Sequence, residues 1–84
     1  MFKRGRLSDN YQMKIPKLRL QFSENLRKER QKSGLTQEKI AEMINISARY
    51  YQMLESKNPP AVKIDTIEKL AKALRIKPSK LLNS

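Results

Sequence analysis

The sequence predicts a small all-α domain built from five short helices. Its 84 residues suit a single domain with a small core. Apolar residues recur at spacings of three and four, which is the period of a helix with one buried face. Residues that begin or end helices stand at the edges of these segments. These observations place helices at about residues 21–33, 37–44, 48–56, 66–74 and 78–82, with no strand and no internal repeat.

Residues 1–20 differ in composition from the rest of the chain and are expected to form a flexible basic arm. Six of them are Lys or Arg and one is Asp, which gives the segment a net charge of +5. Gly5, Pro16 and a cluster of polar residues between them are expected to interrupt regular structure. The segment is either an arm that follows a phosphate backbone or a tail whose charges are solvated. We favour the arm, whose leading cations are Lys3, Arg4 and Arg6.

The domain itself is expected to extend over residues 21–84. Its first helix has a thin apolar face, since Phe22 and Leu26 are its only strong apolar residues, so tertiary packing must hold it. Gly34 follows as a residue that readily adopts the left-handed conformation that ends a helix.

Residues 34–56 predict two short helices joined by a tight turn. Thr36 and Ser47 can cap them, because each hydroxyl can accept a hydrogen bond from a backbone N–H that a helix start leaves unpaired. The apolar faces consist of Ile40, Met43 and Ile44 in the first helix and Tyr50, Tyr51 and Leu54 in the second. The pair is either a helix-turn-helix that presents its second helix to DNA or a plain αα-hairpin, and the local pattern favours neither.

The last two helices follow a loop that contains Pro59 and Pro60. Asp65 is expected to cap the fourth helix, with Ile64 packed against its first turn. The buried stripe of this helix is formed by Ile67, Leu70, Ala71 and Leu74. Pro78 then suits the first turn of a short fifth helix.

The charge of the chain favours a polyanionic partner. Lys and Arg number 19 against 8 Asp and Glu, so the formal net charge is +11 and the isoelectric point is about 10.3. Nucleic acid is the first candidate for such a partner and an anionic membrane surface is the second.

The residue types that most enzymes use are scarce. The chain has no Cys and no His, and its two Gly residues are too few for a glycine-rich phosphate-binding loop. An enzyme, a cofactor and a metal site are therefore not expected. No apolar run approaches the ~20 residues that span a bilayer, and the N-terminus does not look like a signal peptide. We expect a cytoplasmic protein.

Several segments, in register over residues 22–82, resemble the Cro/repressor (Xre-type) helix-turn-helix domain of phage and bacterial transcription regulators. Residues 64–74 are similar to the fourth helix of that family and residues 78–82 to its short fifth helix. The resemblance implies a five-helix, lambda-repressor-like DNA-binding domain. The other residues that carry it are Phe22, Leu26, Arg27, Arg30, Gly34, Leu35, Thr36, Gln37, Glu38, Ile40, Ala41, Ile46, Ser47 and Glu55.

The resemblance implies contacts with double-stranded DNA at defined positions. Arg49 is expected to contribute most to specificity, because a guanidinium can bind two acceptors of one guanine. Tyr50 belongs equally well to the core or to the interface. Ala48 and Met53 depart from the polar residues usual at their positions and suit thymine methyl groups, or else leave more to DNA shape. The implied base contacts are Ala48, Arg49, Gln52 and Met53, and the implied phosphate contacts are Gln37, Tyr50, Ser56, Lys57 and Asn58.

The resemblance also implies an ion pair and a dimer surface. Arg30 and Glu55 match a pair that joins the first and third helices, the alternative being two unrelated surface charges. One recognition helix covers too few base pairs to specify a genomic site, so we expect a homodimer. The implied dimer surface consists of Ile76, Pro78, Leu81 and Leu82.

We therefore expect a sequence-specific transcription regulator, a repressor or autoregulator acting on an operator with two half-sites. A prophage repressor, a restriction controller and an antitoxin are all compatible with the sequence, as is control by a regulatory partner protein. The alternative function is a protein-interaction module of the antitoxin or adaptor type. Apolar Ala48 and Met53 on the outer face favour that alternative slightly.

Overall fold

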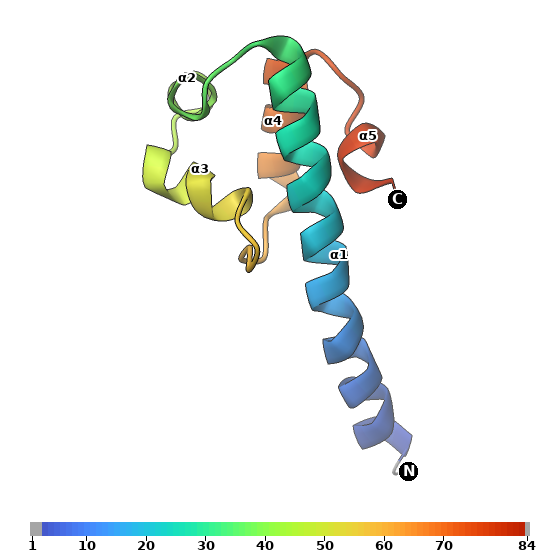
Figure 1. Cartoon of the computed structure of the whole chain (residues 1–84). Coiled ribbons are helices and arrows are strands. Elements are labelled where there is room, and N and C mark those ends of the chain that lie inside the picture. Colours follow the sequence, from blue (N-terminus) through green and yellow to red (C-terminus); the bar gives the residue numbers. More distant parts are fainter. Residues whose placement is uncertain (1–2, 84) are drawn as a thin grey trace.

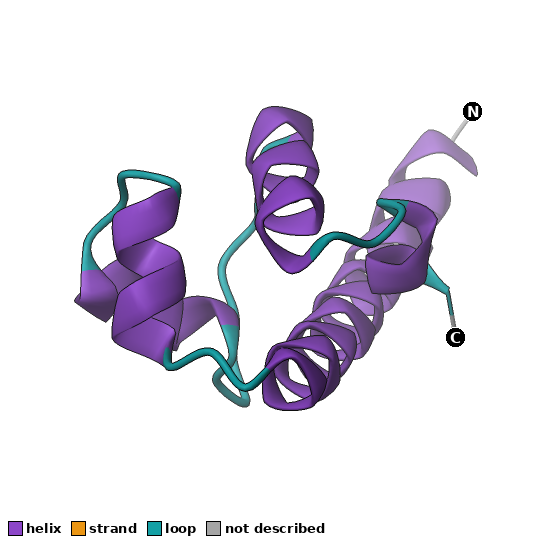
Figure 2. Cartoon of the chain, turned by 90° about the horizontal axis from the view of Figure 1, so that it is seen from above, coloured by secondary structure: helices purple, strands orange, loops and turns teal. Residues whose placement is uncertain are grey.

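The computed structural model describes the backbone of residues 3–83 and the side chains of residues 17–83. The described chain is all-α, as predicted, and Figure 2 shows helices joined by loops. Figure 1 shows the arrangement of α1 (Lys3–Ser33), α2 (Gln37–Met43), α3 (Ala48–Leu54), α4 (Ile64–Leu74) and α5 (Ser79–Leu82).

Helix α1 is longer than the sequence led us to expect. It begins at Lys3, whereas we expected a flexible arm over residues 1–20 and a helix start at about residue 21. The N-terminal part projects beyond the other helices, and the longest extent of the molecule is 49 Å (Figure 1). Gly and Pro inside a helix cost about 1 and 3 kcal/mol, which is a penalty that helix-favouring Lys, Arg, Leu and Gln neighbours can offset. The side chains of Lys3, Arg4 and Arg6 lie outside the described residues.

The core lies where α1, α2, α3 and α4 meet, with α5 closing it against α1. Most of the expected apolar positions are buried. Met43 and Ile64 are exceptions, with 48% and 74% of their surface exposed, so the expectation that they pack inward is wrong. The buried apolar residues are Phe22, Leu26, Ile40, Ala41, Ile44, Tyr51, Leu54, Ile67, Leu70, Ala71, Leu74 and Leu81.

Local hydrogen bonds begin and end the helices around the core. The Thr36 hydroxyl accepts from the backbone N–H of Lys39, and the Ser47 hydroxyl accepts from that of Tyr50, both at 3.0 Å. Gly34 has φ of +78°, which confirms its expected role after α1. Helix α4 begins at Ile64, so Asp65 lies in its first turn and not at the expected cap position. There its negative charge interacts favourably with the helix dipole.

Helix α5 is attached to α1 by side chain and backbone. Asn25 Nδ2 donates to the carbonyl oxygens of Leu81 (3.0 Å) and Asn83 (2.6 Å). Leu81 is fully buried, so its expected place on a dimer surface is wrong: the side chain fills the core. Leu82, by contrast, is 54% exposed, Pro78 is exposed, and Ile76 is partly buried against the core.

Among the described residues, no helix combines the length and the apolar character needed to cross a bilayer.

Candidate nucleic-acid interface

Helix α3 divides its side chains between the core and the solvent. Tyr51 and Leu54 are buried, whereas Arg49, Gln52 and Met53 are exposed. The division follows from the helical period, since residues three or four apart share a face. A helix with a buried anchor face and an outward polar face can be inserted into a groove without loss of its own packing. Ala48, the fourth expected base contact, is half-buried at the start of the same helix.

Glu55, directly after α3, is the centre of a buried polar cluster. Arg30 binds it with both arms of its guanidinium, Nε to Oε2 at 2.6 Å and Nη2 to Oε1 at 3.1 Å. The Tyr51 hydroxyl donates to Oε2 at 2.5 Å, and Gln37 Nε2 donates to Oε1 at 3.0 Å. One carboxylate thus joins side chains from α1, α2 and α3. We call Arg30, Gln37, Tyr51 and Glu55 the Glu55 cluster.

The electrostatics of the Glu55 cluster favour a charged Glu55 and a neutral Tyr51. Burial alone would raise the pKa of Glu55, but hydrogen bonds from Arg30, Tyr51 and Gln37 outweigh it and lower the pKa. The pKa of Tyr51 is raised strongly by burial and by its hydrogen bond to Glu55. The pKa of Arg30 is raised, chiefly by its hydrogen bond to Glu55.

The lowered pKa predicts a contribution of Glu55 to acid stability. Its share of the stability is fully present above the ordinary pKa of glutamate and is lost as the pH falls through the lowered folded-state pKa. Urea unfolding between pH 7 and pH 3 should therefore show a smaller loss of stability on acidification in Glu55→Gln than in the wild type. The exposed Glu42→Gln serves as the matched control and should keep the wild-type dependence. Identical pH profiles for all three proteins would contradict the assignment.

Further contacts tie the end of α3 to α1. Arg27 Nη2 donates to the backbone carbonyl of Glu55 at 3.1 Å, and Ser23 Oγ donates to that of Ser56 at 2.9 Å. Arg30 Nη1 reaches the carbonyl of Leu35 at 3.1 Å. Carbonyls at a helix end have no partner within the helix, so Arg27 and Ser23 supply one at the end of α3, whereas Arg30 holds the loop between α1 and α2. These contacts of Ser23 and Arg27 were not predicted from the sequence.

The expected phosphate contacts do not all face the solvent. The Gln37 side chain is half-buried and its amide donates to Glu55, so a phosphate contact by this side chain requires that hydrogen bond to be exchanged. Tyr50 is half-buried and packs against the core. Lys57 and Asn58 are exposed in the loop after α3, and the Ser56 hydroxyl donates to the carbonyl of Met53 at 2.7 Å.

No group of His, Cys, Asp and Glu within the described part of the chain is suited to hold a metal ion. No buried side-chain N or O atom there lacks a hydrogen-bond partner.

Comparisons with known proteins agree with this geometry. A helix-turn-helix family model matches residues 26–81. The structure is similar to the crystal structure of the restriction-modification controller protein C.AhdI from Aeromonas hydrophila, with a TM-score of 0.73 and 32% sequence identity, over 79% of this chain and 94% of that one. No curated protein matches the chain. The chain belongs to the Cro/repressor (Xre-type) helix-turn-helix family and is a DNA-binding transcription regulator.

Proposed function

We propose that the protein is a sequence-specific repressor or autoregulator that inserts α3 into the major groove of its operator. The observation that carries this proposal is the outward face of α3, on which Arg49, Gln52 and Met53 are exposed while the Glu55 cluster holds the end of the same helix. A net charge of +11 supports the attraction to DNA that such docking requires.

Each outward residue has a role that follows from its chemistry. Arg49 donates to O6 and N7 of a guanine, and Gln52 pairs with an adenine or contacts the backbone. Ala48 and Met53 contact thymine methyl groups. Lys57 and Asn58, exposed in the loop after α3, contact phosphates and thereby orient the domain on the duplex.

We propose a homodimer that binds two half-sites, with Leu82 and Pro78 at the centre of its interface. Leu18 is 66% exposed on α1 and lies seven residues before Asn25, which contacts α5, so the two share a face of α1. The exposed apolar side chains of Leu82 on α5 and Leu18 on α1 therefore lie on the same side of the molecule. Among the regulators considered, similarity to a restriction-modification controller protein favours a controller of that kind.

Selection of bound sequences from a random duplex library tests the proposal directly. We expect the selected sites to contain two related half-sites about one helical turn apart, or a multiple of it, with a guanine at one position of each. Selection of no common sequence would contradict sequence-specific binding, and single half-sites would contradict the dimer.

Deletion of residues 1–12 is expected to weaken binding to all duplexes alike. The deleted segment contains three cations, Lys3, Arg4 and Arg6, and one carboxylate. Each phosphate neutralised contributes about −0.9 to the slope of log affinity against log salt, so the slope should become less steep by up to about 3. Fluorescence anisotropy at several salt concentrations measures this slope. An unchanged slope would mean that the segment does not contact DNA.

Leu82→Glu is expected to weaken the dimer without unfolding the domain, because a charge replaces a half-exposed apolar side chain at the proposed interface. Analytical ultracentrifugation measures the dimer dissociation constant, which should rise at least about tenfold. Ile64→Glu, at another exposed apolar position, is the matched control and should leave association unchanged. Equal dissociation constants for both variants would place the interface elsewhere.

A further inference from the structure

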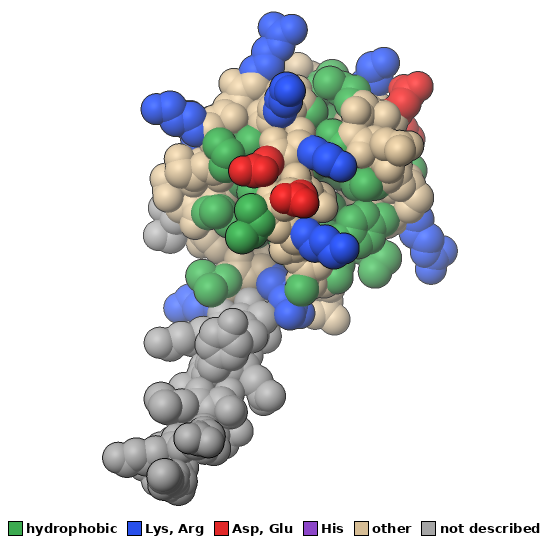
Figure 3. All heavy atoms as spheres, turned by 180° about the vertical axis from the view of Figure 1, so that it is seen from behind, with side chains coloured by type: hydrophobic (Ala, Val, Ile, Leu, Met, Phe, Trp, Pro, Cys, Tyr) green, Lys and Arg blue, Asp and Glu red, His purple; other side chains and the backbone are tan. Residues whose placement is uncertain are grey.

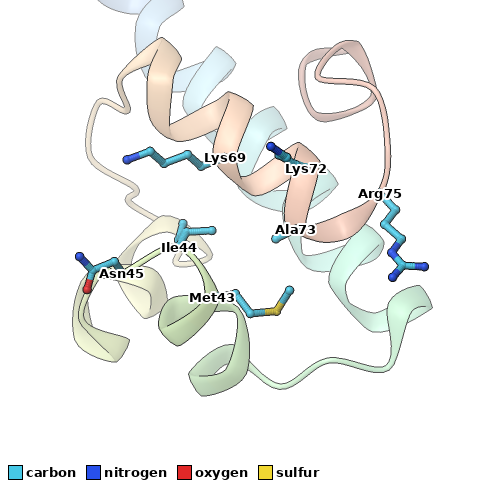
Figure 4. Close-up of a pocket in the computed structure, with 7 residues that line it drawn as sticks. All are labelled: Met43, Ile44, Asn45, Lys69, Lys72, Ala73 and Arg75. Carbon is cyan, nitrogen blue, oxygen red and sulfur yellow. The ribbon is translucent and has the colours of Figure 1, made fainter.

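A groove between α2 and α4 has no role in the DNA contacts described above. Figure 4 shows its lining, to which the end of α2 contributes Met43 and Ile44 and α4 contributes Lys69, Lys72 and Ala73. Its volume is about 580 Å³, and an adjoining hollow of about 410 Å³ shares Met43 and Ala73 with it. The two hollows form one open surface, which we call the α2–α4 groove.

The α2–α4 groove combines an apolar floor with a cationic rim. Met43 is 48% exposed at a position where the helical pattern predicts burial, and a flexible thioether adapts readily to different apolar partners. Lys69, Lys72 and Arg75 line the α4 side of this floor (Figure 4). Within the described residues none of the three forms an ion pair with a carboxylate. Figure 3 shows Lys and Arg beside exposed hydrophobic side chains on one face of the molecule, with Asp and Glu side chains among them.

The backbone conformation of Arg75 is a second observation that supports a binding role for its side chain. Arg75 ends α4 with φ of +60°, in the left-handed conformation that Gly usually adopts at helix ends. A residue with a side chain costs about 1 kcal/mol or more in this conformation. The conformation brings the Arg75 side chain to the edge of the groove, together with Lys69 and Lys72.

The α2–α4 groove is at the opposite end of α2 from Gln37, one of the proposed phosphate contacts. Gln37 begins α2 and Met43 ends it, which separates them by roughly 9 Å along the helix axis at a rise of 1.5 Å per residue. Arg49 and Gln52 belong to α3 and do not line the groove.

We propose that the α2–α4 groove binds an acidic amphipathic segment of a partner protein. An apolar side chain of the segment lies on Met43, Ile44 and Ala73, and its carboxylates pair with the cations of the rim. Lys69 and Lys72 lie three residues apart on α4, which matches carboxylates spaced one helical turn apart on a bound helix, and Arg75 adds a third cation directly after the end of α4. A nucleic-acid backbone would satisfy the cations but would leave the apolar floor unpaired, so an acidic protein segment fits better.

Methyl NMR of the full chain with labelled methionines tests the proposal, because Met43 lies in the groove and Met53 on the outward face of α3. The probe is a synthetic helical peptide with Leu and Glu on one face, and its twin has Gln in place of every Glu. The Glu peptide should shift the Met43 methyl signal and leave that of Met53 in place. The Gln twin should bind at least about tenfold more weakly.

Charge reversal distinguishes binding to the cations of the groove from general electrostatic attraction to a basic protein. The double variant Lys69→Glu with Lys72→Glu should bind the Glu peptide at least about tenfold more weakly than the wild type. Lys77→Glu with Lys80→Glu changes the net charge equally at exposed positions outside the groove and should bind almost as the wild type does. Circular dichroism checks that both variants are folded.

Three results would overturn the proposal. The first is an unshifted Met43 signal at millimolar Glu peptide, and the second is an equal loss of affinity in the two double variants. The third is a shift of Met43 by duplex DNA that disappears, together with DNA binding, in the Lys69→Glu, Lys72→Glu variant. That result would make the α2–α4 groove part of the nucleic-acid surface.

Discussion

Glu55→Ala is expected to lower the free energy of unfolding by about 3–5 kcal/mol, the usual cost of removing one partner from a buried ion pair. The substitution leaves Arg30, Gln37 and Tyr51 without their shared acceptor, and Arg30 becomes an uncompensated, partly buried charge. A domain of this length has a total stability of roughly 4–13 kcal/mol, so the loss is a large part of it. Urea unfolding followed by circular dichroism measures the difference.

Glu42→Ala is the matched control for this prediction. Glu42 is exposed and its ion pair with Lys39 is long, at 3.7 Å, so its loss should change the stability by no more than about 0.5 kcal/mol. The DNA affinity of Glu55→Ala, measured where the protein is still folded, should also fall, because the cluster sets the orientation of α3. A stability of Glu55→Ala within 0.5 kcal/mol of the wild type would show that the cluster is not a major support of the fold.

Arg49→Ala is expected to cost about 1–3 kcal/mol of discrimination at a single base position, which corresponds to roughly 5–150-fold in relative affinity. The side chain is exposed on the outward face of α3 and contributes nothing to the core, so the stability should remain that of the wild type. Competition between the selected operator and variants with one changed base pair measures the discrimination position by position.

Lys57→Ala provides the contrast. It lies in the loop after α3, where the proposal gives it a phosphate rather than a base, so its loss should weaken binding to every duplex by a similar factor. Unchanged preference among sites in Arg49→Ala would refute the base contact. If the preference among sites changed in Lys57→Ala and not in Arg49→Ala, Lys57 would be the base contact and Arg49 the phosphate contact.

Local rules were sufficient to predict α2, α3 and α4. Thr36 and Ser47 act as caps, and the apolar stripe of α4 is buried, because both features depend on residues a few positions apart. The length of α1 was not predicted, because Gly5 and Pro16 were expected to end the helix. Within a helix these residues cost only about 1 and 3 kcal/mol of stability. The exposure of Met43 and the burial of Leu81 rather than Leu82 depend on how α4 and α1 pack, which periodicity does not contain.

The candidate site was predictable in part. The family resemblance predicted an ion pair between Arg30 and Glu55, and the two side chains form it in the structure. The third and fourth members of the cluster were missed, since Gln37 was assigned to a phosphate and Tyr51 to the core alone. The spacing of Tyr51 and Glu55, four residues apart at a helix end, is a signal from which their hydrogen bond could have been found.

Two turns of α1 contact both the end of α3 and the helix α5, which carries the proposed dimer surface. Ser23, Arg27 and Arg30 hold the end of α3, whereas Asn25 holds α5. In the proposed dimer, α1 therefore connects each α3 to the dimer interface. It sets the distance between the two copies of α3 and their relative rotation about the DNA axis. Substitutions that repack this part of α1 should change the preferred spacing between half-sites while leaving the sequence of each half-site unaltered.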